Sequence, residues 1–286
     1  MMSIVKNCLV TVGLIFVLCG CSAKVESGEH VVGVEFEPSE QSILKVVYWN
    51  TTNGMSYDAD NDYARFTAWV AEQNPDVLAV CEADAAMLAD KMEAWGHSYI
   101  AVADDERYPV VVTSRYETGI AESVAVADGK SALHVTVGDI HFVVMDIDRT
   151  LAPLAACARM VSVLDATYDN RSYVAEKWVV GGSMYHLSVM DMDDAPDMYP
   201  SRIDADEYRF DLYAWNENLV DCIAQLYKFF IPTYTPTDAS SEAYRADYVY
   251  VSKSIYQGCL DSAEIIDDDF AARASEHKPI VLTVRY

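Results

Sequence analysis

Four polar residues stand at the ends of Val- and Ile-rich runs, where their side chains could do chemistry. Asn50 ends ILKVVYWN, Glu82 ends DVLAVCE, Asp247 begins DYVYVS and His277 lies two residues before PIVLTV. Carboxylate oxygens bind hard divalent cations, and a carboxylate can fix the tautomer of a histidine that moves protons. Loops at strand ends often carry active sites. The alternative is structural: Asn50 and Glu82 would cap turns, and His277 would be a hydrogen-bonded loop histidine.

The elements that must position these residues can be read from the hydrophobic pattern. Tyr63, Phe66, Trp69 and Val70 recur at three- and four-residue spacing, which predicts an amphipathic helix over 62–73, and further helices are predicted over 84–95 and 152–168. Strands alternating with helices, then neighbouring strands, predict an α/β fold: a four-layer sandwich of two packed mixed β-sheets flanked by helices. The predicted strands are 43–50, 76–82, 109–115, 119–126, 132–137, 141–147, 177–182, 247–252 and 279–284.

Composition limits the class of protein. The 286 residues are 52% hydrophobic and 11% aromatic, with apolar runs along most of the chain, which excludes a disordered protein. One large domain is compatible with this length. The net charge of −25 repels polyanions, so tight binding of long DNA or RNA is disfavoured.

The N-terminal segment resembles an export signal. Lys6 precedes a short apolar run that ends in Leu18-Cys19-Gly20-Cys21, similar to the lipobox of bacterial lipoproteins. This predicts a signal peptide over 1–20, lipidation of Cys21, and a polar tether over 21–42 that leads into a domain over 43–286. The protein would then be anchored by lipid in the bacterial cell envelope, at the outer membrane or cell surface. An ordinary signal peptide and an uncleaved anchor are the alternatives.

Four cysteines remain in the predicted domain: Cys81, Cys157, Cys222 and Cys259. They could form up to two disulfides, but none shows CxxC metal spacing. Cys81 and Cys157 lie in apolar runs and are expected to be small core residues.

Other kinds of site find little support. The histidines lack HxxxH spacing, which disfavours zinc, and no Gly-x-Ser-x-Gly elbow of a serine hydrolase occurs. The segment 183–211 is strongly acidic and is expected to be a solvated loop. A Ca²⁺ site at Asp191-Met192-Asp193-Asp194 is the alternative, although the glycine and distal glutamate of an EF-hand are absent.

Several segments, in order, resemble the endonuclease/exonuclease/phosphatase family of metal-dependent phosphoesterases. LKVVYWN resembles the family's opening strand, NPDVLAVCE its second strand ending in glutamate, and YPVVVTSRYE the strand followed by Ser-Arg-Tyr. HFVVMDID and VVGGSMYH stand where the family has strands ending in Thr-His-Leu and Gly-Asp-x-Asn, and RADYVYVS and SEHKPI resemble Arg-Ile-Asp-Tyr and Ser-Asp-His-Arg-Pro. The resemblance covers about 43–286 and implies the family's fold.

The resemblance also implies roles for the candidate residues. Glu82 would be the main ligand of Mg²⁺ or Mn²⁺, and Asn50 would help to hold the metal or the phosphate. Asp247 would orient His277, whose imidazole would stabilise the phosphoryl group. The substrate would be a small phosphate ester, and we expect a monomer.

Three positions depart from the family pattern. Ser183 stands in place of the aspartate that orients the attacking water, and serine is no base at neutral pH. Tyr185 replaces the asparagine that holds the phosphate. Asp146 replaces the histidine at the end of its strand, which puts an anion before an anionic substrate and is repulsive unless a cation lies between them.

Losing one positioned base costs about 10²–10⁴-fold in rate, so the altered set predicts a weak enzyme or a pseudoenzyme that only binds. A rebuilt, more acidic metal site from Glu82, Asp146 and Asp148 is an alternative within the same fold. A different class remains open: a non-catalytic surface lipoprotein that binds a glycan or a protein partner through aromatic residues such as Tyr208, Tyr213, Trp215 and Tyr234.

Overall fold

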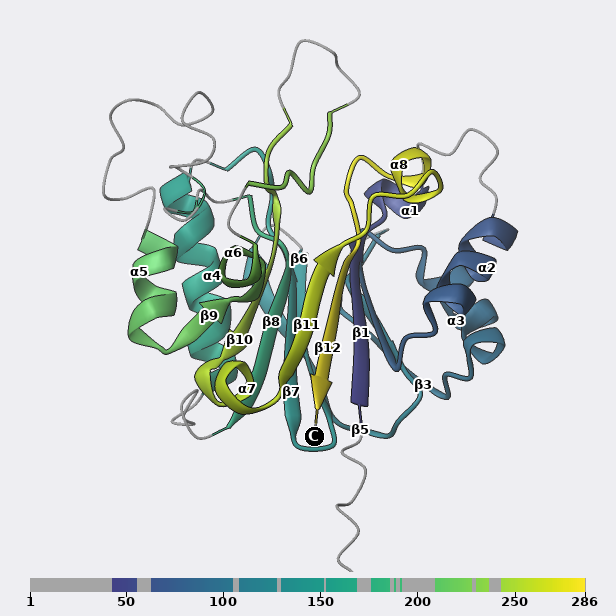
Figure 1. Cartoon of the computed structure of the whole chain (residues 1–286), viewed down its shortest axis with the longest axis horizontal. Helices are drawn as coiled ribbons and strands as arrows, with labels where there is room; N and C mark the ends of the chain where they lie inside the picture. Colours follow the sequence, from purple (N-terminus) through teal and green to yellow (C-terminus); the bar gives the residue numbers. More distant parts are fainter. Residues whose placement is uncertain are drawn as a thin grey trace, which may run out of the picture. The chain divides into compact units, whose positions relative to one another are not determined.

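Two six-stranded β-sheets pack face to face at the centre of the structure, which is a computed structural model (Figure 1). It describes residues 43–55, 63–104, 108–127, 130–151, 153–168, 176–185, 188, 191, 209–227, 230–236 and 243–285. The predicted signal peptide, Cys21 and the tether lie outside these ranges. Within the described part of the chain, no helix has the length and apolar character needed to cross a membrane.

Sheet A contains the strand order β11-β12-β1-β2-β4-β3, and only its β1–β2 pair is parallel. Sheet B has the order β5-β6-β7-β8-β10-β9, and only its β7–β8 pair is parallel. Both sheets are therefore mixed, as predicted. The strands of sheet A are β1 (Ile43–Asn50), β2 (Val77–Cys81), β3 (Tyr99–Val102), β4 (Val111–Ser114), β11 (Leu260–Ile265) and β12 (Ile280–Arg285); those of sheet B are β5 (Thr118–Ala127), β6 (Lys130–Val137), β7 (Ile140–Asp146), β8 (Lys177–Ser183), β9 (Leu219–Asp221) and β10 (Asp247–Ser252).

Helices cover the outer faces of the two sheets (Figure 1). On sheet A lie α2 (Tyr63–Gln73), α3 (Ala85–Lys91) and the short η1 (Met92–Trp95), and on sheet B lie α4 (Pro153–Tyr168) and α5 (Arg209–Asn216). Short helical turns connect the remaining strands: α1 (Thr52–Met55), α6 (Cys222–Leu226), α7 (Lys253–Gly258) and α8 (Ala271–Ala274). The predicted helix over 84–95 is divided, because Asp84 caps α3 and the chain tightens into η1 after Lys91.

Three apolar cores separate the four layers. The middle core lies between the sheets and includes Val46, Phe142 and Val249, while the outer cores pack α4 and α5 on sheet B and α2 and α3 on sheet A. Phe66, Trp69 and Val70 face the core as their spacing predicts. All four described cysteines are free thiols, and Cys81, Cys157 and Cys222 are buried, so the expectation of core cysteines at 81 and 157 is confirmed.

Arg245 forms a buried ion-pair network near one end of sheet B. Its Nε donates to Asp191 Oδ2 at 2.9 Å and its Nη2 donates to Asp221 Oδ2 at 2.6 Å. The guanidinium also stacks over the Tyr248 ring at 4.2 Å. Asp191, predicted as part of a solvated acidic loop or a Ca²⁺ site, is therefore buried and paired with arginine. The other residues of the Asp191–Asp194 run lie outside the described residues.

Tyr48 of β1 carries a hydroxyl that is buried without a hydrogen-bond partner among the described residues. Tyr48→Phe is therefore expected to leave the free energy of unfolding unchanged or raise it by about 1 kcal/mol, because no hydrogen bond is lost and a desolvated polar group is removed. Tyr250→Phe is the matched control, because the Tyr250 hydroxyl donates to Asp211 Oδ1 at 3.2 Å. Urea unfolding should show a loss only in the control. An equal loss of unfolding free energy in both variants would contradict a Tyr48 hydroxyl that makes no hydrogen bond.

Candidate active site

Asn50 connects the two sheets at the end of β1. Its Nδ2 donates to Ser183 Oγ at 2.9 Å and, over a longer 3.3 Å, to Glu82 Oε1, while its Oδ1 accepts the Thr52 N–H at 2.8 Å. The side chain is 2% exposed. Asn50 therefore turns hydrogen-bond donors, and not its oxygen, toward Glu82, which is the arrangement of a residue that positions Glu82.

Glu82 follows β2 and sits against an unusual turn. Its φ is +49°, and every residue of α1 also has positive φ, with values of 43° at Thr52, 52° at Asn53, 66° at Gly54 and 61° at Met55. Non-glycine residues in the left-handed region are strained and gather at functional sites. The turn directs the Asn53 N–H to Glu82 Oε2 at 2.8 Å and the Gly54 N–H to the Glu82 carbonyl at 2.8 Å. The carboxylate is thus held in one orientation.

Asp247, His277 and Tyr185 form a hydrogen-bonded chain. Asp247 begins β10 and contacts His277 Nδ1 through Oδ1 at 3.0 Å and through Oδ2 at 2.8 Å, while the Tyr185 hydroxyl lies 3.0 Å from His277 Nε2. Burial alone would lower the pKa of His277, but the charge and hydrogen bond of Asp247 raise it. Burial and Asp247 also raise the pKa of Tyr185 far above its usual range, so its phenol stays protonated. Because His277 Nε2 and the Tyr185 hydroxyl are bonded to each other, protonated His277 donates its Nε2–H to the Tyr185 oxygen and leaves the Tyr185 O–H as the donor for a ligand.

Ser183, at the end of β8, links the two groups already described. Its hydroxyl donates to Asp247 Oδ1 at 2.7 Å and accepts from Asn50 Nδ2. The side chain is fully buried. Asn50, Glu82, Ser183, Asp247, His277 and Tyr185 thus form one continuous network, and within it Ser183 acts as a connector that cannot take a proton from water at neutral pH.

Asp146 ends β7 and pairs in register with Ser183. Its Oδ2 accepts a hydrogen bond from Lys130 Nζ at 2.7 Å, while its buried Oδ1 has no hydrogen-bond partner among the described residues. Burial raises the pKa of Asp146 to about 6, and Lys130 opposes that rise only in part. Burial alone would lower the pKa of Lys130, but the Asp146 charge raises it.

The raised pKa of Asp146 makes a prediction about stability. Because the folded state favours the neutral carboxyl, wild type should lose stability relative to Asp146→Asn as the pH rises from about 4 to about 6. A change of about two pKa units corresponds to about 3 kcal/mol. Urea unfolding of both proteins at pH 4.0 and pH 7.5 measures most of this difference. If the stability of wild type relative to Asp146→Asn stays constant or increases as the pH rises, the raised pKa of Asp146 is contradicted.

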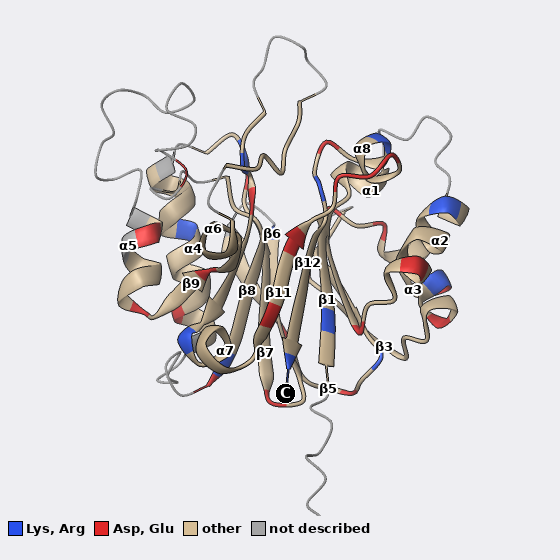
Figure 2. Cartoon of the chain, viewed as in Figure 1, with Lys and Arg blue, Asp and Glu red and all other residues tan. Residues whose placement is uncertain are grey.

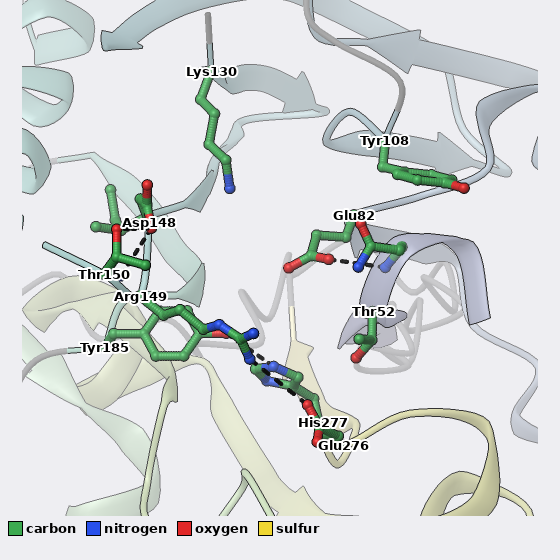
Figure 3. A pocket seen from close by; sticks show the side chains of 12 residues that line it. Thr52, Glu82, Tyr108, Lys130, Asp148, Arg149, Thr150, Tyr185, Glu276 and His277 are labelled. Atoms are coloured by element: carbon green, nitrogen blue, oxygen red, sulfur yellow. Dashed lines mark hydrogen bonds and ion pairs between the residues drawn. The ribbon is translucent and has the colours of Figure 1, made fainter. Parts of the chain in front are cut away.

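These residues surround a pocket of about 300 Å³ at the end of the two sheets. Figure 3 shows Glu82 and His277 on its walls, with Lys130 reaching toward the space between Asp148 and Glu82. The lining residues are Thr52, Asn53, Glu82, Tyr108, Lys130, Ile147, Asp148, Arg149, Thr150, Tyr185, Glu276 and His277. The structure therefore brings Glu82, Tyr185 and His277 to one pocket, with Asn50, Ser183 and Asp247 behind them and Asp146 behind Lys130.

The charge of the pocket is not balanced. Lys130 pairs with Asp146, and Arg149 Nη1 lies 3.8 Å from Glu276 Oε2. Glu82 and Asp148 have no ion-pair partner in the described part of the chain. Figure 2 shows acidic positions on strands, helices and loops elsewhere in the fold as well. Two unpaired carboxylates in one pocket favour a ligand that brings positive charge with it.

The donor set fits a divalent cation held at Glu82. Each Glu82 oxygen accepts one N–H and keeps a lone pair, and carboxylate oxygens suit Mg²⁺ and Mn²⁺. No group of three His, Cys, Asp or Glu side chains is arranged around a metal position among the described residues. Mg²⁺ is often bound by one or two carboxylates together with water and substrate phosphate. We therefore expect weak binding of the ion alone and tighter binding with a phosphate ester.

Sequence reasoning missed Lys130, Arg149, Tyr108 and Glu276 as pocket residues. Lys130 follows a short Asp-Gly turn signal, which predicts a hairpin but says nothing about where the next side chain points. Asp148 was considered only as part of a rebuilt metal site, and it lines the pocket with Oδ1 accepting from the backbone and hydroxyl of Thr150, both at 2.8 Å.

Comparison with known proteins identifies the architecture. No protein-family model matches the sequence, and no curated protein matches it. Among solved structures, the 3'-5' exonuclease NExo from Neisseria meningitidis is 15% identical with a TM-score of 0.67, covering 85% of this chain and 100% of its own. An AP endonuclease from Archaeoglobus fulgidus is 15% identical with a TM-score of 0.65, covering 84% of this chain and 98% of its own.

A third similar structure carries the family term itself. It is an endonuclease/exonuclease/phosphatase from Beutenbergia cavernae DSM 12333, which is 19% identical with a TM-score of 0.61 and covers 86% of this chain and 72% of its own. The sequence resemblance and the two-sheet sandwich thus lead to the same architecture. The chain has the endonuclease/exonuclease/phosphatase fold.

Proposed function

We propose that the chain binds a small phosphate ester together with a divalent cation in this pocket, and that it hydrolyses the ester slowly. The observation that carries the proposal is the placement of the bonded His277–Tyr185 pair, which keeps a donor for a ligand when His277 is protonated, in the same pocket as the unpaired carboxylate of Glu82. Donors suit the phosphate oxygens, and the carboxylate suits the cation. Similar solved structures include a 3' phosphatase and nucleases, which supports phosphate chemistry for this fold.

Each residue has a distinct task in this proposal. When bound at Glu82, Mg²⁺ or Mn²⁺ would neutralise charge on a phosphate oxygen. Asn50 and the Asn53 N–H keep the Glu82 carboxylate in place. Asp247 holds the Nδ1 side of His277, protonated Nε2–H donates to the Tyr185 oxygen, and the Tyr185 O–H is left to donate to the ester.

Slow turnover follows from Ser183. A hydroxyl that donates to Asp247 and accepts from Asn50 cannot activate water near neutral pH. We therefore expect a rate about 10²–10⁴-fold below that of an enzyme with a positioned base. Tight binding with little turnover would make the chain a phosphate-ester receptor.

The location and the size of the ligand belong to the same proposal. A signal peptide over 1–20 and a lipid on Cys21 would place the pocket in the cell envelope, where small phosphate esters such as headgroups or sugar phosphates occur. The net charge of −25 works against long nucleic acid. Two of the similar structures contain bound product DNA, and this DNA binding is an observation on those proteins alone.

Glycan binding receives less support. Among the aromatic residues considered for it, Trp215 is 82% exposed, whereas Tyr234 is 6% exposed and lies beside His277. Tyr213 is half-buried and hydrogen-bonds Asp165, and Tyr208 lies outside the described residues. A single exposed ring is a small platform for a sugar.

Calorimetric titration with phenyl phosphate tests the proposal. In millimolar Mg²⁺, wild type and the control Glu93→Gln, which changes an exposed carboxylate on η1, should bind the ester. Glu82→Gln should bind it about 10- to 100-fold more weakly, the loss expected for a charged contact. Equal affinity in Glu82→Gln and wild type would contradict the role of Glu82, and absence of binding in wild type would contradict the proposal as a whole.

A further inference from the structure

Lys130 presents a cation to the pocket that no sequence pattern indicated. It begins β6, its side chain is 33% exposed, and it lines the pocket. Asp146 Oδ2 accepts one of its hydrogen bonds at 2.7 Å. An ammonium group has three N–H donors, so two remain for another acceptor. Figure 3 shows the amine pointing into the space between Asp148 and Glu82.

Asp146 fixes the position of this amine. The Asp146 side chain is 7% exposed and sits at the end of β7, where the regular strand leaves it little freedom. The sequence alone put an anion at this position, facing an anionic ligand. In the structure Lys130 covers that anion, so the pair as a whole offers the pocket N–H donors in place of a bare carboxylate.

The other donors come from different elements. Tyr185 follows β8 and His277 precedes β12, whereas Lys130 comes from β6. Arg149, the other cation of the pocket, is committed to the Tyr234 hydroxyl at 3.2 Å and lies near Glu276. Lys130 differs from Arg149 in that its amine is held by a buried carboxylate, Asp146, at 2.7 Å, whereas the Arg149 side chain is 57% exposed.

We propose that Lys130 Nζ contacts the phosphate of the bound ester and that Asp146 acts as its positioning residue. The inference deepens the proposed function and rests on it. On the β6–β7 side of the pocket, the contact to the anionic ligand would then come from the Lys130–Asp146 ion pair. A phosphate group that accepts from the Tyr185 hydroxyl at one oxygen would accept from Lys130 Nζ at another.

A double-mutant cycle tests both halves of this proposal, with phenyl phosphate in Mg²⁺ as the probe. Lys130→Met should weaken binding about 10- to 100-fold, because it removes a charged contact and leaves Asp146 bare. Asp146→Asn should weaken binding less. The double variant should bind better than Lys130→Met alone, since the bare anion is gone, and Lys130→Arg should retain most of the affinity.

Lys177→Met is the matched control, because Lys177 begins β8 of the same sheet, does not line the pocket and pairs with the exposed Asp139 at 2.9 Å. It should bind like wild type. If wild type binds the ester and Lys130→Met binds equally well, the contact is overturned while the proposed function stands. If Asp146→Asn binds the ester as tightly as wild type, or weakens binding as much in the Lys130→Met background as in wild type, the positioning role of Asp146 is overturned. If wild type binds no ester, both proposals fail.

Discussion

Replacing Gly182 with alanine is expected to lower the free energy of unfolding by about 3–5 kcal/mol. Gly182 has a φ of +132°, and a Cβ there would lie 1.9 Å from the backbone oxygen of Met145. The cost combines a backbone conformation that side chains rarely adopt with a clash against the neighbouring strand β7, which cannot move without breaking its parallel pairing. Thermal or urea unfolding measures the loss.

Gly138→Ala separates the two contributions. Gly138 also has a positive φ, of +59°, but a Cβ there would meet nothing within 4 Å. We expect a loss of about 1 kcal/mol in this variant, from the backbone conformation alone. Comparable losses at both positions would show that close approach of β7 and β8 is not what requires glycine at 182.

Arg245→Met is expected to cost about 3–5 kcal/mol. The change leaves Asp191 and Asp221 buried without their cation, and a buried carboxylate without a partner is strongly destabilising. Arg285→Met is the control, because Arg285 and its partner Asp261 are 49% and 34% exposed, and surface pairs contribute about 0–1 kcal/mol. Urea unfolding that ranks the two variants equally would contradict the burial of this network.

The central strands could be predicted because their two faces are buried. Runs such as 43–50 and 141–147 stay apolar over both faces, since one face meets the opposite sheet and the other meets a helix. Edge strands β3 and β11 were missed because they lack two buried faces. Asp261, Ser262 and Glu264 of β11 are polar and largely exposed, so the local pattern does not distinguish this strand from a loop.

The candidate site was partly accessible from sequence for a related reason. Asn50, Glu82, Asp247 and His277 follow or precede buried strands, and strand ends on one side of a sandwich converge. Lys130 could not be found this way, because its role depends on where Asp146 lies across the β6–β7 pairing and on a side chain several bonds long. The direction in which Asn50 turns its amide likewise depends on the left-handed turn after it.

The most direct test of the central claim is a reciprocal titration of wild type with Mg²⁺ and phenyl phosphate, each added alone and in the presence of the other. If the pocket holds both together, Mg²⁺ alone should bind weakly, phenyl phosphate should tighten it, and Mg²⁺ should tighten phenyl phosphate by the same factor. Affinities that do not depend on the other ligand, or no binding of either, would contradict a shared site at Glu82 and His277.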